Sequence, residues 1–258
     1  MNNYLLLLLI AHVLGDYYSQ SESIAVNKNK NYKSLLMHCL VYTLIMIVLT
    51  QLIENRNGLI GSLIASLIHA IIDVIKYNIY QLQVSTHIKT KRIVTKYIQN
   101  GKVYIGDQVL HLVSILAIDF WFVNASGSYD SLSFIGINHL DENLILRVVL
   151  VTLLLMKPVN ITFKKVFSII KPVMAEQSNF VGEKSVGRLI GNLERLLIFI
   201  LLLLNQYGAI GLVFTAKSIT RYNKIVEDKQ FGEYYLLGTL YSILATLILY
   251  LLVIKTTY

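Results

Sequence analysis

Residues 66–76 read Ser66-Leu67-Ile68-His69-Ala70-Ile71-Ile72-Asp73-Val74-Ile75-Lys76, and they set the class of the protein. They belong to an apolar run, Leu59–Ile75, of roughly bilayer length, yet they include a histidine, a carboxylate and a lysine. Positions 69, 73 and 76 are spaced i, i+4 and i+7, which places these three side chains on one face of a helix. Ionisable groups at membrane depth cost roughly 2.5–3.5 kcal/mol each on insertion scales. The stretch therefore predicts a membrane-spanning helix with a functional polar face.

The composition extends this interpretation to the whole chain. Hydrophobic residues make up 55% of the sequence and charged residues only 15%, a balance that favours a membrane protein over a soluble one. Other apolar runs that approach bilayer length are Leu35–Ile53, Val103–Val123, Tyr234–Ile254 and, with its flanks, Leu196–Leu204. We expect an all-α, polytopic transmembrane helical bundle of about eight helices, at residues 3–20, 34–53, 58–77, 102–123, 143–157, 187–205, 208–222 and 231–254.

The distribution of charge predicts the orientation. Lysines and arginines concentrate in alternate loops, whereas the loop 124–142 has none; the basic loops are 21–33, 77–102, 157–188 and 222–230. By the positive-inside bias, we expect a multi-pass protein of the cell membrane with these loops in the cytoplasm and both termini outside. The net charge of +8 then needs no nucleic-acid partner.

The domain organisation follows from the absence of any sequence feature that marks a boundary. We expect residues 1–258 to form a single integral membrane domain. Within it, residues 1–124 form a half that is rich in histidine and aspartate, and residues 143–258 form a half that is rich in glutamate, arginine and lysine.

Histidine and aspartate recur at one spacing in three helices of the first half. Each pair is separated by four residues, so that both side chains can reach one ion, as in helical zinc and di-iron sites. A further histidine opens the second helix. The expected topology places all of these residues at one depth, near the cytoplasmic face. The candidate metal ligands are His12, Asp16, His38, His69, Asp73, Asp107 and His111.

Neutral imidazole and carboxylate groups suit a divalent metal ion. We expect zinc first, with manganese or iron as alternatives, and seven ligands are enough for two ions. We expect catalytic roles for Asp73, Asp107 and Lys76, with a spare carboxylate or histidine as general base and the lysine as a contact for an anionic substrate group. The same cluster also fits a proton or ion relay or a structural polar network, and Lys76 also fits a lysine that extends to the membrane surface.

A second polar group lies in the other half of the chain. Its two carboxylates and three cations fit an internal ion-pair network that holds helices six to eight together, which is the interpretation we favour. The excess of positive charge also fits a site for a phosphate or carboxylate. The residues are Glu194, Arg195, Lys217, Arg221 and Glu233.

Several short motifs carry a resemblance to a known family. The clearest are HxxGD at residues 12–16, HxxxD at 69–73 and DQxxH at 107–111; others are at 38–42, 193–198, 216–221 and 233–239. With these motifs the sequence resembles an uncharacterised bacterial family of multi-pass membrane proteins, known as a domain of unknown function. The resemblance spans nearly the whole chain and implies a membrane fold, but it brings no activity.

The function that these residues favour is a membrane-embedded, metal-dependent hydrolase of a lipid or phosphate ester. Clustering of the polar residues on one side favours an enzyme, because a transporter needs a polar path to the other side. A proton- or ion-coupled transporter and a membrane subunit that docks a cytoplasmic protein remain alternatives, so the sequence does not settle whether the chain is an enzyme. The expected partners are the lipid bilayer and a lipid or anionic small molecule.

Overall fold

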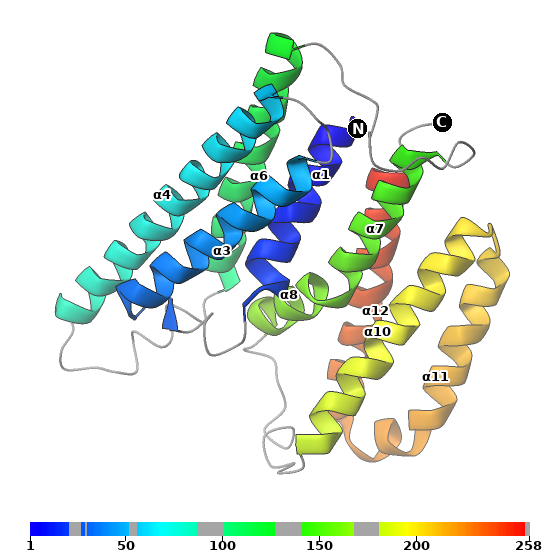
Figure 1. Ribbon diagram of the computed structural model, residues 1–258. Helices are drawn as coiled ribbons and strands as arrows, with labels where there is room; N and C mark the ends of the chain where they lie inside the picture. Colours follow the sequence, from blue (N-terminus) through cyan, green and yellow to red (C-terminus); the bar gives the residue numbers. More distant parts are fainter. Residues whose placement is uncertain are drawn as a thin grey trace. The chain divides into compact units, whose positions relative to one another are not determined.

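The computed structural model describes residues 1–20, 27–28, 30–51, 56–86, 101–126, 141–167 and 181–255. These residues are almost entirely helical, and none of them forms a strand. The helices are α1 (Asn3–Val13), η1 (Leu14–Tyr18), α3 (Tyr32–Thr50), α4 (Arg56–Thr86), α6 (Gly101–Ser126), α7 (Glu142–Met156), α8 (Pro158–Val166), α10 (Val181–Leu203), α11 (Tyr207–Glu227), α12 (Lys229–Leu249) and η2 (Tyr250–Ile254) (Figure 1).

The predicted all-α class is confirmed. Each of the eight predicted helices has a counterpart within the described residues, where η1 and η2 are π-helical turns that extend α1 and α12, and α8 follows α7 after a single residue. The largest difference in length concerns α4, which continues to Thr86 instead of ending near residue 77.

The chain divides into two compact units, Met1–Leu153 and Leu154–Tyr258. The first contains α1, α3, α4, α6 and most of α7, and the second contains α8, α10, α11 and α12. The prediction of one integral domain over residues 1–258 stays a prediction, because two compact units occur within single membrane domains as well as in separate ones.

Helix α1 is the core of the first unit. Its sequence is apolar on all sides, and nearly all of its residues from Tyr4 to Val13 are buried, as expected for a helix surrounded by others. The side chain of Asn2 starts the helix by accepting a hydrogen bond from the backbone N–H of Leu5 at 2.6 Å. Helix α1 packs against α3 and α6, and α4 packs against the same two helices (Figure 1).

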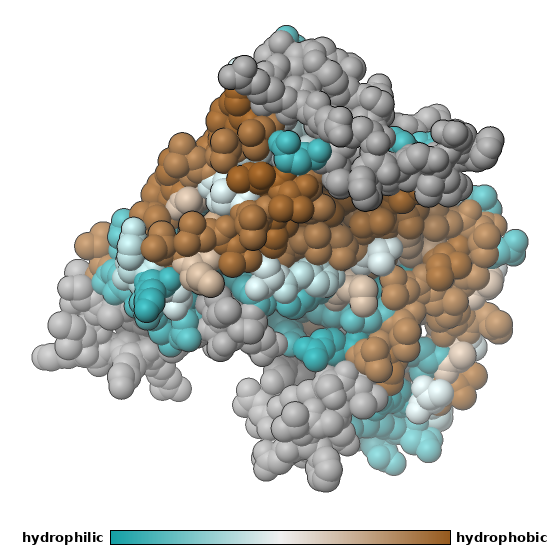
Figure 2. Space-filling model, viewed as in Figure 1, coloured by the Kyte–Doolittle hydropathy of each residue, from teal (hydrophilic) through white to brown (hydrophobic). Residues whose placement is uncertain are grey.

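Helix α4 has its apolar face outside and its polar face inside. Its buried polar residues are Ser62, Ser66, His69 and Asp73. Large apolar side chains spaced three or four residues apart are exposed along the other face, namely Ile60, Leu63, Leu67, Ile71, Ile75, Ile79 and Leu82. In Figure 2, brown apolar residues cover the edge that α4 forms. Because a water-soluble helix has the reverse pattern, this outer face fits lipid.

Five helical segments within the described residues are long and apolar enough to cross a membrane. By length and composition they indicate a membrane protein; they are Tyr32–Thr50, Gly58–Leu82, Gly101–Asn124, Glu142–Val166 and Lys229–Ile254. Four of them coincide with predicted apolar runs. The run Leu196–Leu204 is not among them, because Glu194 and Arg195 precede it in α10 and shorten its apolar length. The orientation of the termini stays a prediction.

Candidate metal centre

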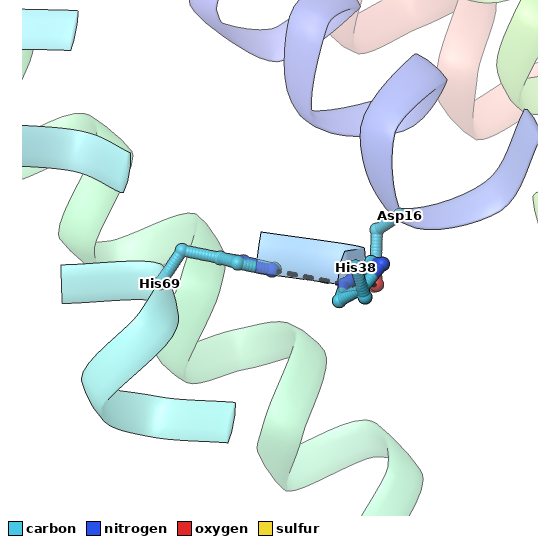
Figure 3. Close-up of side chains that lie close together, drawn as sticks. All are labelled: Asp16, His38 and His69. Atoms are coloured by element: carbon cyan, nitrogen blue, oxygen red, sulfur yellow. Dashed lines mark hydrogen bonds and ion pairs between the residues drawn. The ribbon is translucent and has the colours of Figure 1, made fainter. Parts of the chain in front are cut away.

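Asp16 lies in the π-helical turn η1 that continues α1. The turn is closed by a hydrogen bond from the backbone N–H of Ser19 to the carbonyl of Leu14 at 2.8 Å, and the Ser19 hydroxyl donates to the carbonyl of Gly15 at 2.5 Å. Single π-helical turns within helices occur frequently at functional sites. Here the turn places the Asp16 carboxylate beside His38 of α3 (Figure 3).

The first group of candidate ligands consists of Asp16, His38 and His69. All three are buried, and each offers a ligand atom within 4.8 Å of the other two. The Nε2 atoms of His69 and His38 are 3.3 Å apart, and His38 Nε2 is 3.5 Å from Asp16 Oδ1 (Figure 3). The ring of Tyr42 stacks on the imidazole of His69, with 3.6 Å between the ring centres. This stacking fixes the plane of the His69 ring.

The second group consists of Asp73, Asp107 and His111, which are buried and meet the same distance criterion. His111 Nε2 is 3.7 Å from Asp107 Oδ1. Neither ring nitrogen of His111, nor Nδ1 of His69, has a hydrogen-bond partner among the described residues. Buried polar atoms almost always have a partner, and an imidazole nitrogen beside two carboxylates is a common ligand of divalent metals. The donor set therefore fits a metal ion.

His12 joins the same buried region from α1. Its Nδ1 lies 3.1 Å from the hydroxyl of Tyr42, and its ring centre is 5.4 Å from that of His111. The structure thus brings all seven predicted ligands into one region. The sequence paired a histidine with an aspartate of the same helix, whereas the structure forms groups across helices. Asp16 meets His38 and His69 of other helices, whereas His12 belongs to neither ligand group. The spacing of four residues keeps Asp73 within 3.7 Å of His69.

Lys28 is a member of this site that the sequence did not reveal. Its ammonium Nζ donates to Asp16 Oδ1 at 3.1 Å and to Asp73 Oδ2 at 3.2 Å, and it lies 3.2 Å from His38 Nε2. Burial opposes the charge, but the two carboxylates outweigh burial and raise the pKa of Lys28 above its ordinary value. Because Lys28 and the exposed Lys30 lie in the same basic loop, nothing in the sequence distinguishes them.

Lys76 contacts the carboxylates from the rim of the site. Its Nζ is 2.6 Å from Asp107 Oδ2 and 3.8 Å from Asp73 Oδ1, and 27% of its side chain is exposed. The predicted catalytic residues Asp73, Asp107 and Lys76 are therefore neighbours. Their roles in a reaction stay a prediction.

A series of hydrogen bonds through Gln108, Tyr17 and Tyr104 also holds Asp16, and the sequence did not predict it. The amide of Gln108 donates to Asp16 Oδ2 at 3.1 Å and accepts from the hydroxyl of Tyr17 at 2.8 Å. The hydroxyls of Tyr17 and Tyr104 are 2.7 Å apart. The glutamine of the DQxxH motif therefore orients a candidate ligand carried by another helix.

Gly15, the glycine of the HxxGD motif, allows a close approach of η1 to α3. A Cβ atom at this position would lie 2.6 Å from Cδ2 of Tyr42, whose side chain is 1% exposed and stacks on His69. We expect Gly15→Ala to destabilise the protein by about 1–3 kcal/mol, because the Tyr42 ring has no free space into which to move. Thermal unfolding of the purified protein in detergent measures this change.

The matched control is Gly106→Ala in α6. A Cβ at Gly106 meets no atom within 4 Å among the described residues, and alanine is favoured over glycine inside a helix by about 0.5–1 kcal/mol. The control is therefore expected to unfold at the wild-type temperature or above it. A Gly15→Ala protein that is as stable as wild type would contradict the assigned role of Gly15.

The second polar group is only partly brought together. Glu194 of α10 and Lys217 of α11 form an ion pair at 2.5 Å. The Lys217 ammonium also lies 5.3 Å from the centre of the Tyr235 ring of α12, so this pair links three helices. Arg221 and Glu233 are exposed at the surface of their helices.

Arg195 is buried among neutral partners instead of carboxylates. Its Nε donates to the carbonyl of Leu155 at 2.7 Å, and its Nη2 donates to the side-chain oxygens of Asn160 at 2.9 Å and Asn192 at 2.7 Å. Its Nη1 is 3.3 Å from the hydroxyl of Ser242. Arg195 therefore links α7, α8, α10 and α12, which fits a structural role.

A comparison with family models places the chain in a known group. A model described as a protein of unknown function, DUF3307, matches residues 4–140, more than half of the chain. The chain belongs to this family. The DUF3307 match contains all seven candidate ligands, Lys28 and Lys76, whereas the motifs of the second half lie beyond it. No curated protein and no solved structure matches the chain. Membership of DUF3307 confirms the predicted uncharacterised family, and it assigns no activity.

Proposed function

We propose that this protein is a multi-pass protein of the cell membrane and a metal-dependent hydrolase of a lipid or phosphate ester. The observation that carries the proposal is the state of His111. This residue is 1% exposed, and neither ring nitrogen has a hydrogen-bond partner among the described residues, although Asp73 and Asp107 are its neighbours. A buried imidazole in this state is well suited to bind a metal ion.

The residues that would hold the ion are those of the second group, Asp73, Asp107 and His111, with the first group, Asp16, His38 and His69, as a further set of donors. Imidazole nitrogen with carboxylate oxygen favours zinc first, and manganese or iron as alternatives. A bound divalent ion supplies Lewis acidity and lowers the pKa of a bound water. A carboxylate that does not ligate the ion would accept the proton of that water.

Lys76 and the surrounding helix surface support the choice of substrate. The Lys76 ammonium is partly exposed at the rim of the site and is suited to contact an oxygen of a phosphate or carboxylate. The outer face of α4 exposes large apolar side chains from Ile60 to Leu82. An anionic headgroup beside an apolar surface favours an ester of a lipid.

The first test is the metal content of the protein purified in detergent. We expect at least one equivalent of a divalent metal per chain by elemental analysis, and its loss in the double variant His69→Ala/Asp73→Ala. The double variant Glu194→Gln/Lys217→Met, which breaks an ion pair of the other compact unit, is expected to keep the metal. A folded wild-type protein that contains and takes up no metal would overturn the proposal.

The second test separates hydrolysis from the alternatives. We expect ester hydrolysis of an anionic lipid in mixed micelles that stops on chelation and returns with zinc. Proton or ion flux in proteoliposomes without hydrolysis would support the transporter instead. Co-purification of a cytoplasmic protein without hydrolysis or flux would support a membrane subunit.

A further inference from the structure

We propose that Lys28 takes the place of a second divalent cation, so that the site binds one metal ion and not two. This inference rests on the proposed metal site. The seven candidate ligands would be enough for two ions, and six of them, all except His12, form two groups of three. The number of ions therefore depends on whether another cation already fills one of the groups.

In the first group, Asp16, His38 and His69, the Lys28 ammonium is already such a cation. Its Nζ contacts Asp16 Oδ1 and His38 Nε2, two of the three ligand residues in that group, and also Asp73 of α4. An ammonium has three N–H donors, and Lys28 has three such contacts at 3.1–3.2 Å. A metal ion in this group would have to bind Asp16 and His38 beside an ammonium that already contacts Asp16 Oδ1 and His38 Nε2, so two cations would compete for one position. The ammonium and a metal ion therefore exclude each other at this position.

The second group is in a different state. The nitrogens of His111 have no hydrogen-bond partner among the described residues, and Lys28 does not contact His111 or Asp107. Within the described residues, Lys28 contacts this group through Asp73 alone, whereas Lys76, which contacts Asp107 and Asp73, reaches the group from the partly exposed rim. The second group is therefore where the single ion binds.

The charge of the site also favours one ion. Asp16, Asp73 and Asp107 bring three negative charges, and Lys28 and Lys76 bring two positive ones. One divalent ion gives a small positive excess that a hydroxide or an anionic substrate balances. Two ions with both lysines in place would leave three uncompensated positive charges in a buried site, which is strongly unfavourable.

The two lysines differ in how firmly they belong to the site. The side chain of Lys28 is 8% exposed, against 27% for Lys76. Lys76 reaches the site from the rim, where its ammonium can exchange a carboxylate for water or substrate. The ammonium of Lys28 cannot exchange its partners in this way because its contacts are buried. Lys28 is therefore a permanent cation of the site.

The test is the stoichiometry of zinc binding to the full-length protein in detergent. Metal-free protein is dialysed against buffered zinc and then analysed for zinc and protein. We expect wild type to saturate at one ion per chain. Lys28→Met keeps the length of the side chain without its charge and is expected to bind two ions. Lys28→Arg, which keeps the charge, and Lys30→Met, which removes an exposed lysine of the same segment, are expected to bind one.

The outcomes separate this inference from the proposed function. Saturation of wild type at two ions, or of folded Lys28→Met at one, overturns the role of Lys28 and leaves the metal site intact. Absence of zinc from both proteins overturns the proposed function as well. If Lys28→Met does not fold, Lys28→Gln is the second neutral variant, since its side chain is polar but carries no charge, and two ions are again expected. If neither neutral variant folds, wild-type saturation decides: one ion supports the inference and two overturn it.

Discussion

Replacing His111 with alanine is expected to weaken zinc binding by at least about 100-fold, which is the largest single effect that the site predicts. Removing a residue that only supports a metal ligand typically costs 10–100-fold in affinity, and His111 is placed to be a ligand itself. Its nitrogens are buried without a hydrogen-bond partner among the described residues, so the replacement removes no hydrogen bond of the described residues. Competition with a chelator of known affinity measures the dissociation constant.

His12→Ala is the matched control for this prediction. Both histidines are buried in the same region, but His12 contacts the Tyr42 hydroxyl through Nδ1 and belongs to neither ligand group. Its replacement is expected to weaken zinc binding by less than about tenfold, which is less than the 10–100-fold cost of removing a residue that supports a ligand directly, because the His12 Nδ1 contact goes to Tyr42 and not to a candidate ligand. An equal loss in both variants, or a loss in His12→Ala alone, would contradict the grouping of ligands.

Replacing Asp73 with alanine is expected to lower the free energy of unfolding of the metal-free protein by about 3–5 kcal/mol, the usual cost of removing one partner of a buried ion pair. The Asp73 side chain is 2% exposed and lies 3.2 Å from the ammonium of Lys28. Without it, Lys28 keeps one carboxylate partner among the described residues, Asp16. Chemical denaturation in detergent micelles measures the change, and Glu227→Ala, at an exposed position, is expected to cost less than about 0.5 kcal/mol.

A double-mutant cycle shows whether this cost comes from the ion pair itself. The variants are Asp73→Asn, Lys28→Met and the combination of the two. We expect the double variant to lose about 1–3 kcal/mol less than the sum of the single losses, which is the usual coupling between residues in contact. Strict additivity would mean that Asp73 stabilises the protein through other contacts.

Much of the fold could be predicted from local sequence properties. Apolar runs such as Leu59–Ile75 indicate membrane helices because hydrocarbon tolerates few polar groups, and the all-α class followed from them. The exception is the run Leu196–Leu204. Glu194 and Arg195 precede it in α10 and leave its apolar length too short to count as a spanning segment. The polar face of α4 was predicted because residues four apart on a helix share a face, and His69 and Asp73 are indeed 3.7 Å apart.

The class of the protein, its family and its inventory of histidines and aspartates in apolar helices follow from local composition and spacing. Which of these side chains meet depends on how the helices pack. The tertiary structure groups Asp16 with His38 and His69 across helices, places Tyr42 on His69 and brings Lys28 into contact with two carboxylates. These contacts depend on how each helix is rotated about its axis and on where the fold places Lys28. The spacing of residues along one helix specifies neither property. For this reason the sequence does not indicate which of several similar lysines becomes part of the site.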